Sequence, residues 1–233
     1  MTLSRTLIIF DCDGTLVDSQ HLIAEAMRLA FVDADLISPD RTSIIRTVGL
    51  SLPEAIAYLA PEQHLEMREE LVRSYRQWYL TLRQQPQMQE PMFQGAASLL
   101  FDLAARDGVT VGVATGKSLR GVMRMIDNNN LNGIFSTIQT ADNAPSKPNP
   151  AMLLQAMEET GASLETTIMI GDTSYDMIMA ACANVDGIGV AWGYHTMAEL
   201  KKAGAQKIVR SFGALRQALE TKLALPARYE AVA

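Results

Sequence analysis

The chain has 233 residues, of which 48% are hydrophobic and 20% are charged. It is therefore long enough for one or two globular domains and too mixed in composition to be disordered or collagen-like. Its 20 basic and 26 acidic residues give a net charge of −6, which argues against binding to nucleic acid or anionic membranes through bulk charge. We therefore expect the function to lie in a local site.

The cysteines and the lengths of the apolar runs indicate the cellular compartment in which the protein is expected. Its two cysteines, Cys12 and Cys182, lie far apart and outside any CxxC or His-rich context, so neither a disulfide framework nor a zinc site is expected. The apolar run that ends at Asp11 is too short for a secretion signal, and no apolar segment approaches the ~20 residues of a membrane span. We expect a cytoplasmic protein whose partner is neither a membrane nor a nucleic acid.

The first predicted elements are one strand and then a helical segment. The apolar run 7–10 is typical of a buried strand, whereas residues 17–90 contain no clear strand and show helical periodicity instead. Apolar and aromatic residues recur there at spacings of three to four: Leu65, Leu71, Val72, Tyr75, Trp78, Tyr79 and Leu82. This stripe predicts a packed helix face, and a substrate-facing aromatic is the alternative. The segment is predicted to be an inserted helical domain.

Strands and helices alternate after the insertion. Apolar runs predict strands at 109–114, 167–170, 187–191 and 207–209, and helical patterns lie between them, as at 98–105, 119–126 and 150–159. Such alternation implies βαβ units and a parallel sheet covered by helices on both faces. The predicted fold class is therefore α/β, with a Rossmann-like core formed by residues 1–16 and 91–233 and the helical domain inserted at 17–90.

Two carboxylates directly follow the first strand, in the sequence Asp11-Cys12-Asp13-Gly14-Thr15. The carboxyl ends of parallel strands are where ligands bind in open α/β sheets. Gly14 gives the chain the freedom to turn there, so both carboxylates can be presented together. One of them can attack a substrate while the other transfers protons.

Three further motifs carry chemistry. Thr115 and Gly116 follow the second strand and open a helix, where a hydroxyl and free N–H groups suit an anion. Lys147 lies in a proline-rich loop just before a predicted helix. Asp172 and Asp176 follow another strand with a spacing of four, and such hard oxygen ligands suit Mg²⁺ better than zinc.

Taken singly, each motif also occurs in ordinary loops, and an aspartate near a helix start is more often a cap than a ligand. Four carboxylates that converge at one sheet edge, however, would repel one another without a cation, which favours a functional site. In this order the motifs resemble the four motifs of the haloacid dehalogenase superfamily. The resemblance covers residues 7 to about 220, and the insertion stands where that superfamily has its small α-helical cap domain. Within the superfamily the chain looks like the phosphoglycolate phosphatase group.

The resemblance implies catalytic roles. Asp11 would be the nucleophile that forms an aspartyl-phosphate, and Asp13 would be the general acid and base. Thr115 and the N–H of Gly116 would hold phosphoryl oxygens, while Lys147 would neutralise charge on the phosphoryl group and the nucleophile.

The resemblance also implies a metal site. Mg²⁺ would bind the side chains of Asp11 and Asp172 and the backbone carbonyl of Asp13. Asp176 would assist through water or by orienting Lys147.

The resemblance leaves several activities to compare. Dehalogenation is disfavoured because Asp13 is present, and phosphonate hydrolysis is disfavoured because no lysine precedes Lys117. Segment 189–194 resembles that of phosphatases and pyrophosphatases more than that of mutases. The leading expectation is a Mg²⁺-dependent phosphatase acting on a small phosphorylated metabolite, either phosphoglycolate-like or a sugar phosphate.

Other functions stay open. The alternatives are a β-phosphoglucomutase-like phosphosugar mutase, a pyrophosphatase and a catalytically idle binding protein. Arg46 begins a segment, 46–51, that resembles a substrate-contacting cap loop. It could clamp a carboxylate or a second phosphate, or it could be an ordinary surface arginine.

Overall fold

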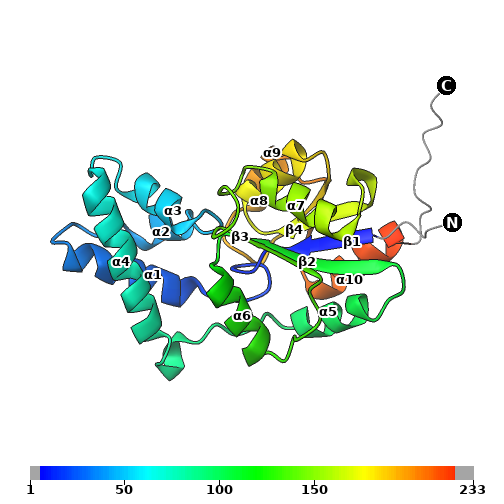
Figure 1. Ribbon diagram of the computed structural model, residues 1–233, viewed down its shortest axis with the longest axis horizontal. Helices are drawn as coiled ribbons and strands as arrows, with labels where there is room; N and C mark the ends of the chain where they lie inside the picture. Colours follow the sequence, from blue (N-terminus) through cyan, green and yellow to red (C-terminus); the bar gives the residue numbers. More distant parts are fainter. Residues whose placement is uncertain (1–5, 224–233) are drawn as a thin grey trace.

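The computed structural model describes residues 6–223 and is built around one six-stranded sheet (Figure 1). The strands are β1 (Thr6–Phe10), β2 (Val109–Thr115), β3 (Thr137–Thr140), β4 (Thr167–Gly171), β5 (Asp186–Val190) and β6 (Lys207–Val209). Their order is β3-β2-β1-β4-β5-β6, and every neighbouring pair is parallel. The predicted α/β class with a parallel Rossmann-like sheet is confirmed.

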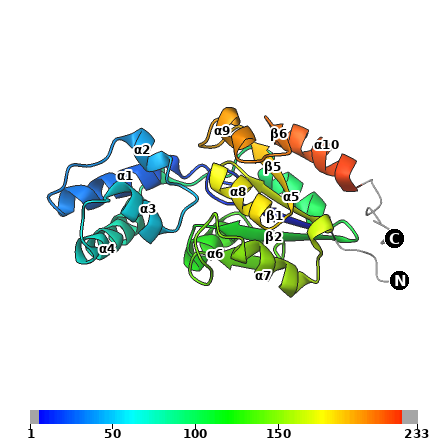
Figure 2. The same cartoon turned by 90° about the horizontal axis from the view of Figure 1, so that it is seen from above.

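Helices cover both faces of this sheet (Figure 2). They are α5 (Ala96–Ala104), α6 (Leu119–Asn128), α7 (Ala151–Thr160), α8 (Ser174–Cys182), α9 (Met197–Lys202) and α10 (Phe212–Leu223), with a short 3₁₀ turn η2 (Leu164–Thr166). Alternate side chains of β1 enter two separate apolar clusters. Ile8 and Phe10 pack with residues of α5, α6 and α10, while Leu7 and Ile9 pack with α7 and α8. Period-two alternation therefore explains why every residue of the apolar run 7–10 is buried.

The insertion forms a separate helical body beside the sheet edge (Figure 1). It contains α1 (Gln20–Asp33), α2 (Arg41–Ile45), α3 (Leu52–Leu59), α4 (Leu65–Leu82) and the 3₁₀ turn η1 (Pro86–Met88). Met27, Ile56 and Leu71 are central to its own apolar core. None of the helices in residues 6–223 combines the length and the apolarity that crossing a membrane requires.

The two chain segments that join the insertion to the sheet domain pair with each other. The N–H of Asp18 donates to the carbonyl of Pro91 at 2.9 Å, and the N–H of Phe93 donates to the carbonyl of Leu16 at 3.0 Å. These bonds lie next to the predicted boundaries at 16/17 and 90/91. The division into core and cap domains at those residues stays a prediction.

Strand β3 was not expected from the sequence. Its four residues read Thr-Ile-Gln-Thr, so no apolar run marks them. The hydroxyl of Thr137 donates to Glu159 Oε2 at 2.5 Å, and the amide of Gln139 donates to the same hydroxyl at 2.9 Å. A polar edge strand is stabilised here by side-chain hydrogen bonds, which hydrophobic patterning does not detect.

Candidate active site

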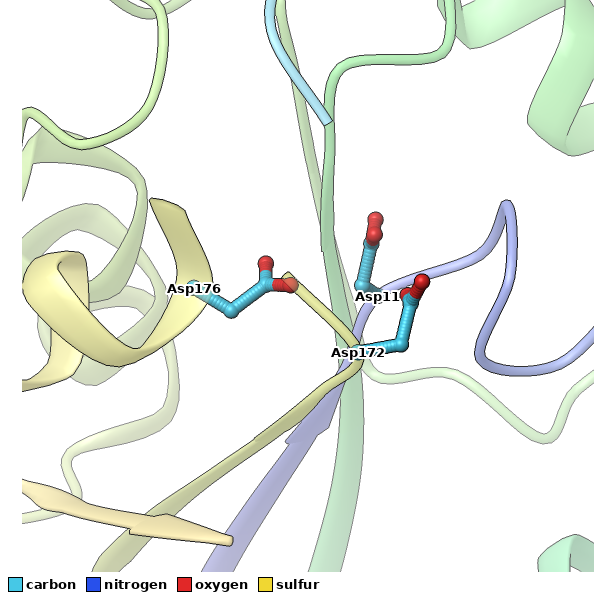
Figure 3. A group of neighbouring side chains, drawn as sticks. All are labelled: Asp11, Asp172 and Asp176. Atoms are coloured by element: carbon cyan, nitrogen blue, oxygen red, sulfur yellow. The ribbon is translucent and has the colours of Figure 1, made fainter. Parts of the chain in front are cut away.

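The predicted site residues come together at the carboxyl edge of the sheet. Asp11 follows β1, Thr115 ends β2 and Asp172 follows β4, so three neighbouring strands deliver them to one place. Asp176 reaches toward Asp11 and Asp172 from the first turn of α8 (Figure 3). The three aspartates are buried, and one carboxylate oxygen from each lies within 4.8 Å of the others.

Local hydrogen bonding fixes two of these carboxylates. Asp176 is the third residue of a capping box, in which the N–H and hydroxyl of Thr173 donate to its Oδ2 at 3.0 and 2.8 Å. Asp172 accepts from the hydroxyl of Thr15 at 2.8 Å and from the N–H of Tyr194 at 2.9 Å. Each carboxylate is therefore held in one orientation by its own neighbours.

Lys147 is the cation of this cluster. It is fully buried, with Nζ 2.9 Å from Asp11 Oδ1 and 2.6 Å from Asp176 Oδ1. Burial lowers the pKa of this lysine, but Asp11 and Asp176 outweigh burial and raise its pKa above the ordinary value. Lys147 is therefore charged at neutral pH, although one positive charge does not balance three carboxylates.

Asp11 has the least satisfied environment. Burial raises its pKa, Lys147 lowers it and the neighbouring aspartates raise it again, so that its pKa is about 6. Neither of its oxygens accepts a well-oriented hydrogen bond from the part of the chain that the structure describes. Burial and the negative charge of Asp11 and Asp176 also raise the pKa of Asp172 well above its usual range. Electrostatics in this pocket therefore favour an additional cation.

The donor set fits a hard divalent cation. The carboxylate oxygens of Asp11, Asp172 and Asp176 are the kind of ligand that Mg²⁺ prefers, and those of Asp11 accept no well-oriented hydrogen bond from the described residues. Two glycines make room at this point, because a Cβ at Gly14 or Gly193 would overlap the side chain of Asp172. Gly14 also has a φ of +84°, a conformation that other residues rarely adopt.

Asp13 belongs to a second polar cluster, which was not predicted from the sequence. Its Oδ1 accepts from Nζ of Lys117 at 2.8 Å, and the same Nζ donates to Glu90 Oε1 at 2.6 Å and to the Tyr79 hydroxyl at 3.0 Å. The Tyr79 hydroxyl in turn donates to Glu90 Oε1 at 2.5 Å. Burial lowers the pKa of Lys117, but Asp13, Tyr79 and Glu90 raise it well above the usual value. Asp13 is thus linked by a buried cation to helix α4 and to the linker that leaves the insertion.

The loop between α2 and α3 covers the opposite side of the site. Thr115 is buried at the end of β2, and a Cβ on Gly116 would overlap the backbone carbonyls of Gly49 and Leu50. The N–H of Ser51 donates to the hydroxyl of Ser146, next to Lys147, at 2.8 Å. The insertion therefore contacts both the loop that follows β2 and the loop that contains Lys147.

Arg46 lies elsewhere. Its guanidinium pairs with Glu199 on α9, and its backbone carbonyl accepts from the Tyr175 hydroxyl at 3.2 Å. It does not belong to the wall of the cavity that contains Asp11. The structure therefore does not bring Arg46 together with the other predicted site residues.

A cavity of about 520 Å³ opens between the insertion and the sheet domain. Asp11, Asp13 and Thr115 lie in its wall, and Ile23, Met27 and Val48 are among the apolar residues that the insertion contributes. Tyr75 and Tyr79 of the predicted stripe also line it, so this stripe both packs inside the insertion and faces the cavity. The volume suits a small molecule.

The arrangement can support covalent chemistry at a small ligand. Asp11 is a buried carboxylate at the wall of the cavity whose described partner is Lys147, an arrangement suited to a nucleophile. Asp13 lies two residues along the same loop, in the same wall, and can transfer a proton. Lys147 and Thr115 can hold an anion between them.

The chain resembles known hydrolases in sequence and in structure. The family model for haloacid dehalogenase-like hydrolases matches residues 8–190. The "Probable phosphatase IndB" of Dickeya dadantii is 37% identical over 212 residues, covering 89% of this chain and 90% of that protein. The phosphoglycolate phosphatase of Colwellia psychrerythraea is 26% identical, over 91% of this chain and 95% of its own. A hydrolase from Pseudomonas syringae superposes with a TM-score of 0.82 at 28% identity, covering 93% of this chain and 98% of that structure.

Proposed function

Because this chain belongs to the haloacid dehalogenase-like hydrolases and is a phosphatase of that family, we propose that it hydrolyses a small phosphorylated metabolite through an aspartyl-phosphate on Asp11. The observation that carries the proposal is the state of Asp11. It is buried beside Lys147, neither of its oxygens accepts a hydrogen bond from the described residues, and it borders a cavity of small-molecule size. A purely structural carboxylate would be left with a large desolvation cost there.

In the first step an oxygen of Asp11 attacks phosphorus, and the bond from phosphorus to the ester oxygen breaks. Asp13 donates its proton to the departing alkoxide, so the alcohol leaves neutral. In the second step Asp13 removes a proton from water, which attacks the phosphorus of the aspartyl-phosphate and releases inorganic phosphate. Asp11 is regenerated as a carboxylate and Asp13 as an acid.

The other residues position and neutralise the phosphoryl group. Lys147 is charged and within ion-pair distance of Asp11, so it can offset the negative charge that builds up during transfer. The hydroxyl of Thr115 and the N–H of Gly116 are proposed to hold phosphoryl oxygens.

A divalent metal ion is part of the proposal. Mg²⁺ would be held by the side chains of Asp11 and Asp172 and the carbonyl of Asp13, with Asp176 nearby, and would supply charge neutralisation at the phosphoryl oxygens. Asp176 orients Lys147 through its 2.6 Å hydrogen bond in either case.

The central test is phosphate release from p-nitrophenyl phosphate. We expect activity with Mg²⁺, its loss in excess EDTA and its recovery when Mg²⁺ is restored. Asp11→Asn should abolish turnover, whereas Asp107→Asn, an exposed aspartate in the loop between α5 and β2, should leave it unchanged. Turnover that survives both EDTA and Asp11→Asn would refute the mechanism.

Two related activities are separated by their products. A phosphosugar mutase would convert one sugar phosphate to another with little net phosphate release, and a pyrophosphatase would release two phosphates from each pyrophosphate. Binding without turnover across phosphate esters would indicate an idle binding protein.

A cytoplasmic location remains part of the proposal, supported by Cys12 and Cys182, both of which are free.

A further inference from the structure

Three arginines line the catalytic cavity in addition to the phosphoryl-binding residues. Arg76 comes from α4 of the insertion, and Arg120 and Arg124 come from α6 of the sheet domain. Residues 120 and 124 are four apart on one helix, so their side chains share a face. Figure 1 shows α4 in the insertion and α6 on the part of the sheet domain that faces the insertion.

These arginines have no acidic partner among the described residues. Arg28, Arg46 and Arg216 each form a salt bridge with a carboxylate, but within residues 6–223 neither Arg76, Arg120 nor Arg124 does. Burial and the positive charges of Arg83 and Arg120 lower the pKa of Arg124, while Tyr79 and Glu90 act in the opposite direction. Three guanidinium groups therefore line this cavity without a salt bridge to a described carboxylate.

The acidic residues of the cavity wall are engaged elsewhere. Asp11 lies beside Lys147, and Asp13 accepts from Lys117. Asp142 accepts from the backbone N–H of Leu119 at 2.8 Å, which begins α6. The remaining lining side chains near the insertion are largely apolar. No carboxylate in the described wall forms a salt bridge with the arginines.

We propose that Arg76, Arg120 and Arg124 bind a second anionic group, carried by the alcohol part of the substrate. The substrate class is then a phosphate monoester with a distal carboxylate or a distal phosphate. This inference rests on the proposed function, because the transferred phosphoryl group occupies Asp11, Thr115 and Lys147. Guanidinium groups pair with carboxylate and phosphate oxygens in the same bidentate geometry, so both anions share this recognition chemistry.

The test uses esters that differ only at the distal end. Ethylene glycol monophosphate ends in a hydroxyl, phosphoglycolate in a carboxylate and ethylene glycol bisphosphate in a second phosphate. We expect kcat/KM to be higher for one or both anionic esters than for the hydroxyl ester. The ester with the higher value identifies whether carboxylate or phosphate is the natural distal group.

Variants assign the preference to the arginines. In the double variant Arg120→Gln/Arg124→Gln we expect kcat/KM for the preferred anionic ester to fall about 10- to 100-fold, the range for lost charge-assisted hydrogen bonds. The hydroxyl ester and p-nitrophenyl phosphate should be nearly unaffected. Arg76→Gln should act in the same direction. Arg106→Gln, an exposed arginine next to the amino end of β2, is the matched control and should change nothing.

Equal losses for all esters, or a wild-type enzyme without preference for anionic ones, would overturn the inference while leaving the phosphatase proposal intact. The melting temperature of the double variant gives a structural check. It should be unchanged or higher, because mutual repulsion is removed. A large decrease would indicate that these arginines stabilise the fold instead.

If no ester is hydrolysed, that result counts against the proposed function. The distal-anion site can then still be tested by measuring ligand binding with calorimetry. Phosphoglycolate, ethylene glycol bisphosphate and ethylene glycol monophosphate are titrated into Asp11→Asn, with and without the double arginine substitution. We expect at least one anionic ester to bind Asp11→Asn more tightly than the hydroxyl ester, and the arginine variant to lose that advantage. Equal affinities in both proteins would overturn the anion site.

Discussion

Replacing Lys117 with methionine removes the cation that joins Asp13, Glu90 and Tyr79. The side chain of Lys117 is only 7% exposed, and those of Asp13 and Glu90 are 10% and 16% exposed, so the substitution leaves two poorly hydrated side chains without their cation, and Glu90 keeps only the hydrogen bond from the Tyr79 hydroxyl. Breaking a buried ion pair in this way costs about 3 to 5 kcal/mol. We expect the free energy of unfolding at pH 7 to fall by about that amount.

The pH dependence of this loss follows from Glu90. Burial raises the pKa of Glu90, but the charge and hydrogen bond of Lys117 outweigh burial, so its folded pKa lies below 4.5. Glu90 therefore stabilises the native protein above its unfolded pKa, and this contribution is lost as the pH falls through the folded pKa. Without Lys117 the burial penalty on the ionised form of Glu90 is opposed mainly by the Tyr79 hydrogen bond and the charge of Arg83. The variant should lose most stability at neutral pH and much less near pH ~4.

Urea unfolding followed by circular dichroism at pH 7 and near pH 4 measures both effects. The double variant Lys117→Met/Glu90→Gln should recover part of the stability at pH 7, with a coupling energy of about 1 to 3 kcal/mol. A loss below about 0.5 kcal/mol at pH 7 would refute the reasoning, since that is the range of ordinary surface substitutions. An equal loss at the two pH values would refute the assigned role of Glu90.

Three further predictions concern the metal, the loop over the site and Arg46. In EDTA, the contribution of Asp11 to the free energy of unfolding should fall by about 3 kcal/mol as the pH rises from ~4 through 6, because its folded pKa is raised from 3.8 to about 6, and Asp172 acts in the same direction. Mg²⁺ should therefore raise the melting temperature more at pH 7 than at pH 5, and equal shifts would contradict this. Gly116→Ala should lower kcat/KM for p-nitrophenyl phosphate at least tenfold with little change in melting temperature. The reason is that its Cβ would overlap the carbonyls of Gly49 and Leu50 in the loop that covers the site. Wild-type kinetics in this variant would show that the close approach of that loop is not needed. Arg46→Gln should leave kcat/KM within about twofold and unfolding within about 1 kcal/mol of wild type, as its exposed pair with Glu199 implies; a large rise in KM would restore Arg46 as a substrate ligand.

The strands that carry the candidate site could be predicted because each is marked locally, by an apolar run that is followed by a polar residue. Residues 7–10 are apolar without interruption, which marks a strand buried on both faces, and polar Asp11 follows at once. The same pattern precedes Thr115 and Asp172. Parallel pairing then places the three strand ends side by side, so local patterns were enough to assemble the edge.

The lysine cluster could not be predicted because no local pattern connects its members. Lys117 lies 104 residues from Asp13, 38 from Tyr79 and 27 from Glu90 along the chain. Only the packing of the insertion on the sheet domain brings them together. For Arg46, the local sequence suggested a contact that the structure does not show. Its segment resembles a substrate loop, but the orientation of the short helix α2 turns its side chain to α9.

Helix α4 connects the two inferences about the cavity. Arg76 and Tyr79 are three residues apart, which places them on one face of this helix, and both line the cavity. Tyr79 accepts a hydrogen bond from Lys117, which holds Asp13, whereas Arg76 belongs to the proposed site for the distal anion. A displacement of α4 would therefore disturb the proposed proton-transferring residue, Asp13, and the proposed contact to the leaving group together. An anion bound by Arg76, Arg120 and Arg124 joins α4 to α6, so a substrate with the correct distal group would itself favour the arrangement that keeps Asp13 in place.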